Sequence, residues 1–214
     1  YHAGFSTYGD ARLGDRYEIR LVDSPGIEAV RPHAAVAVAT AAEASGVTLE
    51  LLDGTVAPTG PRRGQIDIVV ARRSPCGGSW LGCGGPWIER GTISSGIIWI
   101  NPRVFDRPAN ELANTVRHEL GHTLGLAHYE YLHEDRVQSM HPTLFDASDY
   151  ENGDRAGLRF VGGDRAPVTR AAHLRAVTPA PAPPTDPDGA IDEVVAGPFG
   201  IVVRGWASDA DTRG

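Results

Sequence analysis

The spacing of hydrophobic and polar residues predicts strands and one helix in the first third of the chain. Residues 16–23 (RYEIRLVD) alternate apolar and polar side chains as a half-buried strand does, and 47–54 (VTLELLDG) and 65–71 (QIDIVVA) are the next strand candidates. The Ala-rich run 32–46 predicts a helix, because Pro32 suits a first helical turn and Gly46 suits a helix end. The expected order is strand, helix, strand, strand.

The middle of the chain continues with further strands and a longer helix. Residues 86–102 (PWIERGTISSGIIWINP) predict one or two strands. A helix is then expected from about Pro108 to Leu124, since Pro108 suits its start and Gly125 its end. A short helix is expected over 153–161. The helix that ends at Gly125 carries the most informative residues of the chain.

A Pro/Ala-rich tract divides the chain. Residues 178–189 (TPAPAPPTDPDG) show no hydrophobic periodicity, as is typical of an extended linker. We therefore expect a main domain over 1–165, a linker over 166–189 and a short C-terminal segment over 190–214.

The C-terminal segment predicts two strands, AIDEVV and GIVVRGWASDADT. About 25 residues cannot bury a core alone. The segment resembles the start of β-sandwich modules of secreted bacterial proteins, in which case the chain stops inside that module. The alternative is an extra strand pair packed on the main domain.

Composition and charge exclude two classes of partner. The 214 residues are 41% hydrophobic and 22% charged, and they contain no apolar run of the roughly 18 residues that a membrane span needs. The 20 basic residues against 27 acidic ones give a formal net charge of −7, without an Arg cluster that would track a phosphate backbone. We expect a monomer with neither a membrane span nor a nucleic-acid partner.

Cys76 and Cys83 lie in a Gly-rich stretch, SPCGGSWLGCGG, that is flexible enough to close into a disulfide. The alternatives are two free thiols or half of a metal site, but the six-residue gap without further cysteines disfavours a Cys-based zinc site. The chain also begins at Tyr1 without a Met or a signal-peptide pattern, which suggests that a leader was removed. A disulfide and a removed leader both favour secretion.

Residues 118–128 read HELGHTLGLAH, and the offsets of their three histidines suit a single metal ion. His118 and His122 are four residues apart, which puts both imidazoles on one helix face with Cβ atoms about 5–6 Å apart. A catalytic zinc site takes three protein ligands and keeps one position open, and His128 is the candidate third ligand. Gly125 permits this, because a left-handed glycine ends the helix and lets the chain turn back toward the metal.

Glu119 follows His118 directly and is rotated about 100° from it around the helix, so it is poorly placed as a further ligand. It is well placed beside the open coordination position. Zinc lowers the pKa of a bound water toward about 7, and a carboxylate there takes the proton as the water attacks a carbonyl. Glu119 is therefore the candidate general base.

The pattern H-E-x-x-H-x-x-G-x-x-H resembles the zinc signature of the metzincin peptidases. The resemblance implies an α+β zincin fold, with a five-stranded mixed twisted sheet, an antiparallel edge strand, a backing helix, an active-site helix and a C-terminal helix. It also implies a methionine in a tight turn beneath the zinc. Met140, the only methionine of the chain, follows His128 by twelve residues and is the candidate for this Met-turn.

Downstream residues narrow the resemblance. Met140-His141-Pro142 looks like the Met-x-Pro of the matrixins, and 153–160 (GDRAGLRF) resembles the start of the last matrixin helix. Tyr129 departs from the pattern, since the matrixins have Ser after the third histidine. The resemblance covers about 16–162 and makes the chain matrixin-like.

Metzincins bind a peptide along the exposed edge strand above the zinc helix, by strand addition. By position, 85–92 is the candidate edge strand, and Trp87 within it is equally a candidate core aromatic. Pro142 and its neighbours are expected to line the pocket for the residue after the scissile bond. The candidate cleft residues are Trp87, Ile88, Glu89 and Pro142.

Three functions are weighed on these residues. The first is a secreted endopeptidase that hydrolyses a protein or peptide substrate with Zn²⁺ as its cofactor. The second is a zinc-binding recognition or adhesion module without catalysis, and the third is an interaction domain without metal. The complete ligand set and the intact Glu119 favour the endopeptidase.

A structural Ca²⁺ is a further cofactor that the resemblance to matrixins suggests. The acidic pairs Glu134-Asp135 and Asp209-Asp211 are the candidates. No loop of recognisable ligand spacing surrounds either pair, so the sequence supports this ion only weakly.

Overall fold

The computed structural model describes residues 4–77, 80–134, 136–143, 149–163 and 165, together with three strands further along the chain. Its helices are α1 (Ile27–Ser45), α2 (Ala109–Thr123), α3 (Asn152–Gly162) and the short 3-10 helix η1 (Pro102–Asp106). Its strands are β1 (Ser6–Thr7), β2 (Arg12–Leu13), β3 (Arg16–Leu21), β4 (Thr48–Leu52), β5 (Gln65–Val70), β6 (Gly82–Glu89), β7 (Thr92–Ile100), β8 (Leu126–Ala127), β9 (Leu174–Arg175), β10 (Asp188–Gly197) and β11 (Gly200–Ser208).

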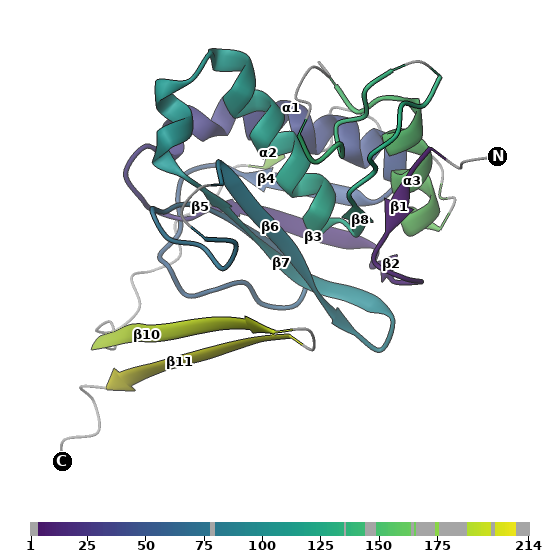
Figure 1. Cartoon of the computed structure of the whole chain (residues 1–214). Helices are drawn as coiled ribbons and strands as arrows, with labels where there is room; N and C mark the ends of the chain where they lie inside the picture. The colour runs from purple at the N-terminus through teal and green to yellow at the C-terminus, as the bar shows by residue number, and fades with distance from the viewer. Residues whose placement is uncertain are drawn as a thin grey trace.

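One mixed sheet forms the centre of the main domain, and α1, α2 and α3 lie on one of its faces (Figure 1). The strand order is β2-β7-β5-β3-β4-β9, and β6 pairs with the other side of β7. Strands β3, β4, β5 and β7 run parallel, whereas β6 is antiparallel to β7, with Gly82 opposite Ile100. The predicted α+β class is confirmed, and the two-residue strands β2 and β9 add to the five strands expected.

Side chains alternate between the two faces of β3. Tyr17, Ile19 and Leu21 are buried and belong to the core under the helices. Arg20 points to the opposite face, because successive side chains of a strand do so, and it meets Asp67 of β5 there. Arg20 Nε lies 2.7 Å from Asp67 Oδ1 and Nη2 lies 3.0 Å from Oδ2. This bidentate pair lets the sheet carry two charged side chains in buried positions.

Helix α1 begins earlier than Pro32, which the sequence pattern placed in its first turn. It starts at Ile27, and Pro32 lies inside it. Ile27 and Val30 extend the buried face upstream of Pro32, so their burial outweighs the helical hydrogen bond that proline cannot make. The expected end is confirmed, because Gly46 adopts φ 68° and its N–H bonds to the Ala42 carbonyl.

The predicted helices α2 and α3 are confirmed to within one residue at each end. Pro108 precedes the first residue of α2, and Gly125 follows its end with φ 99°. Helix α1 packs against both of the other helices. Its contact with α3 is close, because a Cβ on Gly162 would lie 2.0 Å from the carbonyl oxygen of Ser45.

The edge strand differs from the expected range 85–92. That range holds the end of β6, a turn at Arg90 and Gly91, and the first residue of β7. Arg90 and Gly91 have φ values of 49° and 76°, the left-handed conformations of a tight hairpin turn, and Arg seldom adopts them. The strand begins at Gly82 instead, so it includes Gly82 and Gly84, which lay outside the expected range.

The two strands predicted after the linker are confirmed as the antiparallel pair β10 and β11, with Asp188 opposite Ser208. Their assignment to a β-sandwich module stays a prediction. Within the predicted linker 166–189, Leu174–Arg175 forms β9 and pairs with β4. Residues 166–173 and 176–187 lie outside the described part of the chain.

The close contact between α1 and α3 predicts that Gly162→Ala destabilises the protein. The added Cβ meets backbone, which cannot move aside as a side chain can, so we expect a loss of about 1–3 kcal/mol and a melting temperature lower by roughly 3–10 °C. Gly85→Ala is the matched control, because a Cβ there has no atom within 4 Å. Equal melting temperatures of the two variants in calorimetry would contradict the packing of α3 on α1.

Candidate metal centre

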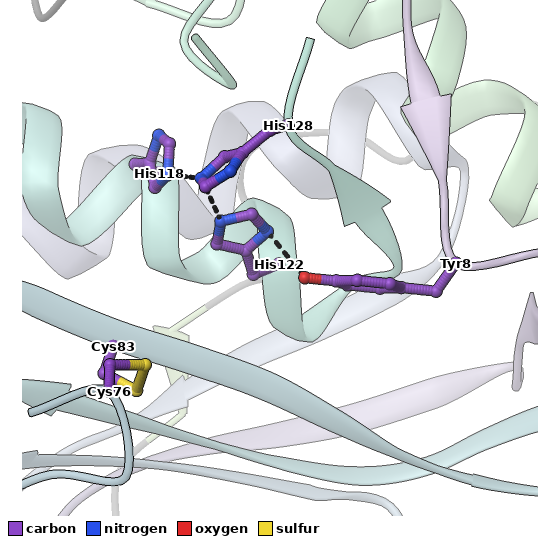
Figure 2. Close-up of a disulfide and its surroundings, with 6 residues drawn as sticks. All are labelled: Tyr8, Cys76, Cys83, His118, His122 and His128. Carbon is purple, nitrogen blue, oxygen red and sulfur yellow. Dashed lines mark hydrogen bonds between the residues drawn. A yellow bond between two sulfur atoms is a disulfide. The ribbon is translucent and has the colours of Figure 1, made fainter. Parts of the chain in front are cut away.

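Helix α2 and the loop after it bring the three histidines of the motif together. His118 and His122 lie on one face of α2, with ring centroids 4.6 Å apart. The helix ends at Thr123, and Gly125, with φ 99°, reverses the chain into β8. His128 follows β8 directly and faces the other two rings (Figure 2). The sequence prediction that Gly125 ends the helix and lets the chain turn back to bring His128 to the other two histidines is therefore confirmed in geometry.

The Nε2 atoms of the three rings converge. His128 Nε2 lies 3.2 Å from His118 Nε2 and 3.1 Å from His122 Nε2. Tetrahedral zinc with Zn–N distances of about 2.0–2.1 Å separates two ligand nitrogens by about 3.3 Å. The side chains offer three ligand atoms within 4.8 Å of one another. This donor set fits one metal ion.

Hydrogen bonds at the far side of two rings fix which nitrogen carries the proton. His118 Nδ1 donates to the Ser139 carbonyl at 2.7 Å, and His122 Nδ1 donates to the Leu126 carbonyl at 2.8 Å. Because carbonyl oxygens only accept, both protons are on Nδ1. The Nε2 atoms therefore present lone pairs toward the point where the rings meet, which is the state that binds a metal.

Burial keeps these histidines neutral. It lowers the pKa of His118 to about 3 and that of His122 to about 4, with further lowering by the neighbouring histidines. The pKa of His128 is also lowered, mainly by burial. At neutral pH, protons therefore compete little with a metal for these nitrogens.

Glu119 lies against β6. It is buried, and the Gly84 N–H hydrogen-bonds to its carboxylate. Burial raises the pKa of Glu119 to about 8. A Cβ on Gly84 would lie 2.5 Å from the Glu119 carbonyl oxygen, and one on Gly82 would lie 2.7 Å from Oε1. Only glycines at these positions let the edge strand approach α2 so closely.

A pocket of about 200 Å³ opens beside the metal ligands. It is lined by Trp80, Leu81, Gly82, Thr115, His118, Glu119 and Pro142. Pro142 lines this pocket together with His118 and Glu119, and its predicted role in binding a substrate side chain stays a prediction. Trp80, Leu81 and Gly82 were not predicted, although their position between the two cysteines was a signal that they belong to one tethered loop.

The other three predicted cleft residues lie further along β6 and do not line this pocket. The Trp87 carbonyl accepts a hydrogen bond from Ser94 Oγ, and Glu89 forms an ion pair with Arg63. Ile88 is 44% exposed. The strand begins three residues earlier than expected, and Gly82 and Gly84 are its residues next to Glu119.

The predicted disulfide between Cys76 and Cys83 is confirmed (Figure 2). Cys83 belongs to β6, and the bond ties the segment with Trp80 and Leu81 to the edge strand. A disulfide is typical of proteins that fold in an oxidising compartment. In the described part of the chain, no helix has the length and apolarity needed to cross a membrane.

Met140 lies in a tight turn below α2. The His141 N–H bonds to the Gln138 carbonyl at 3.0 Å, which closes the turn, and Met140 is 2% exposed. Its Sδ lies beside Gly121, where a Cβ would be only 2.4 Å away. Gly121 belongs to the helical turn between His118 and His122, so the methionine packs under the two ligands of α2.

Asp154 holds this turn and was not predicted. Its carboxylate accepts the N–H groups of Ser139 at 2.7 Å, Met140 at 3.2 Å and Glu151 at 3.1 Å. Glu151 and Asp154 form a capping box at the start of α3. An acidic residue three positions into a helix was the available signal, but its partners in the turn could not be inferred from spacing.

The calcium candidates receive no support from the described residues. Glu134 accepts a hydrogen bond from Asn152 Nδ2, and Asp135, Asp209 and Asp211 lie outside the described part of the chain. Among the described residues, His118, His122 and His128 form the group that could hold a metal ion.

Three neutral imidazoles that face one point can hold a divalent metal, and a buried carboxylate that lines the same pocket can accept a proton beside it.

No protein-family model and no curated protein matches the chain.

The lowered pKa values of His118 and His122 predict a pH-dependent stability of the metal-free protein. Each folded pKa lies below the ordinary 6.5, so the unfolded chain binds more protons as the pH falls below about 6.5. Stability is therefore fully present above that pH and is lost progressively toward about pH 4. Urea unfolding should show a lower free energy of unfolding at pH 5 than at pH 7. His118→Gln should make this difference in free energy smaller. A difference that His118→Gln leaves unchanged would contradict this assignment.

Asp154→Ala should destabilise the protein by about 3 kcal/mol or more, because at least two buried N–H groups of the turn lose their acceptor. Asp154→Asn keeps one carbonyl oxygen and should lose less. Thermal unfolding of both variants measures this order, and an Asp154→Ala protein that melts like the wild type would show that the turn does not depend on α3.

Proposed function

We propose that this chain is a secreted zinc-dependent endopeptidase of the metzincin type, with a matrixin-like catalytic domain. The observation that carries the proposal is the convergence of three imidazole Nε2 atoms beside Glu119, all supplied by the H-E-x-x-H-x-x-G-x-x-H pattern. The mixed sheet with its antiparallel edge strand, and the turn with Met140 under α2, support the same family. The disulfide supports secretion.

His118, His122 and His128 would hold the metal. Imidazole ligands suit several transition metals, and three of them with an open position are typical of catalytic zinc. A bound zinc ion would lower the pKa of a water molecule in its open position to about 7 and polarise a substrate carbonyl. A cation next to Glu119 would also lower the pKa of this carboxyl from about 8, since an opposite charge favours the ionised form.

Glu119 would act as the proton carrier of peptide hydrolysis. It accepts a proton from the attacking water as the water oxygen bonds to the peptide carbonyl carbon. It then gives the proton to the amide nitrogen as the C–N bond breaks, which releases an amine and a carboxylic acid. The Gly84 N–H holds the carboxylate in place between the strand and the helix.

Strand β6 and the adjoining pocket would bind the substrate. Among the described elements, β6 pairs with β7 alone, so its other edge can accept an extended peptide by strand addition. Trp80, Leu81 and Pro142 give the pocket an apolar lining. We therefore propose an extended peptide with an apolar side chain in this pocket.

The proposal is tested by zinc content and by cleavage of a mixed peptide library, measured on one purified sample before and after chelation. We expect about one zinc per chain and cleavage that chelation abolishes and zinc restores. Zinc binding without cleavage would favour a non-catalytic recognition module. A chain without affinity for zinc would overturn the metal centre.

The role of Glu119 has its own test. Glu119→Gln keeps the size of the side chain but cannot accept the proton, so kcat/KM should fall by about 100-fold or more while zinc stays bound. Glu111→Gln, on the first turn of the same helix, is the matched control and should cleave like the wild type. A Glu119→Gln protein with the wild-type rate would end the general-base assignment.

A further inference from the structure

The N-terminal segment 4–9 contacts the loop that joins the second and third metal ligands. Strand β1 pairs with β8, with Ser6 opposite Ala127 and Thr7 opposite Leu126. The Tyr8 N–H continues this pairing to the Gly125 carbonyl at 3.0 Å. The whole backbone between the end of α2 and His128 is therefore held from one side by the start of the chain.

Tyr8 extends from this segment to a metal ligand. Its Oη lies 3.1 Å from His122 Nδ1, and the two ring centroids are 6.0 Å apart. Figure 2 shows the hydroxyl on the far side of His122 from the point where the three histidines meet. Tyr8 is 40% exposed, so burial in the core does not explain why the hydroxyl points at the ring.

The His122 Nδ1–H faces two acceptors, the Leu126 carbonyl and the Tyr8 hydroxyl. Two acceptors that share this one N–H restrain rotation of the imidazole ring about χ2 and favour the tautomer with the lone pair on Nε2. Electron density donated to the N–H also makes the opposite nitrogen a stronger metal ligand.

We propose that Tyr8 is a positioning residue of the metal centre, whose hydroxyl orients His122 for metal binding. The inference rests on the proposed metal centre and goes beyond the motif, because it makes the first strand of the chain part of the site. Tyr8 is not among the residues that line the pocket.

The segment has anchors that do not involve the Tyr8 hydroxyl. The Phe5 ring lies 5.6 Å from that of Phe160 on α3. Gly4 packs against Gly153, where a Cβ would lie 2.0 Å from the Gly4 carbonyl oxygen. Removal of the hydroxyl alone should therefore leave β1 paired with β8, which makes Tyr8→Phe a selective test.

The test compares the zinc affinity of the wild-type chain with that of Tyr8→Phe, by competition with a chromophoric chelator. We expect the zinc Kd to rise about tenfold, the low end of the range for partners of metal-bound histidines, because the Leu126 carbonyl remains. The metal-free variant should melt within about 2 °C of the wild type, since the lost contact is partly exposed. Cobalt(II) bound in place of zinc should show a shifted absorption spectrum.

Tyr129→Phe is the matched control. Tyr129 follows His128 directly, and its buried hydroxyl has no hydrogen-bond partner among the described residues. Its removal should leave the zinc Kd unchanged, so a tenfold effect confined to Tyr8→Phe would assign the effect to the contact with His122.

The outcomes separate this inference from the proposed function. A Tyr8→Phe chain that binds zinc as tightly as the wild type would overturn the role of Tyr8, whether or not the protein cleaves peptides. A wild-type chain that binds zinc without cleaving peptides would leave the role of Tyr8 intact and count against the peptidase. A wild-type chain without affinity for zinc would overturn both.

Discussion

The hydrogen bonds at the Nδ1 atoms of His118 and His122 are the constraint on which the rest of the site depends. Each bond places the proton on the outer nitrogen and thereby turns a lone pair toward the neighbouring ring. Imidazoles packed 3.1–3.2 Å apart at Nε2 would repel one another as cations, so burial and these bonds together keep them neutral. The three nitrogens consequently form one concave donor set.

The acceptors of these bonds come from parts of the chain that hold no ligand. Ser139 belongs to the turn that Asp154 of α3 fixes, and Leu126 belongs to β8, which β1 holds. The C-terminal helix and the N-terminal strand therefore each control one ligand of α2. The donor set of α2 is therefore positioned by contacts from both sides of it in the sequence.

The sequence predicted those features that depend on local spacing. The helical offset of His118 and His122, the break at Gly125 and the disulfide required only neighbouring residues, and all three were found. The features it missed join distant positions: Tyr8 and His122 are 114 residues apart. Pro32 misplaced a helix start because tertiary burial overrode a local signal, and the glycines before residue 85 hid the beginning of the edge strand.

Glycine at positions 82 and 84 has a consequence for how such a site can diversify. Burial raises the pKa of Glu119 where β6 packs directly on α2. At positions 82 and 84 of this strand, any side chain would push the two elements apart. Further along the same strand, Ile88 and Glu89 project into solvent, where substitution alters only the outer surface. One strand thus has a half whose residues are fixed by packing against α2 and a half whose side chains are exposed. Under the proposed function, substitutions in the exposed half would change the outer surface of the strand and leave the surroundings of Glu119 as they are.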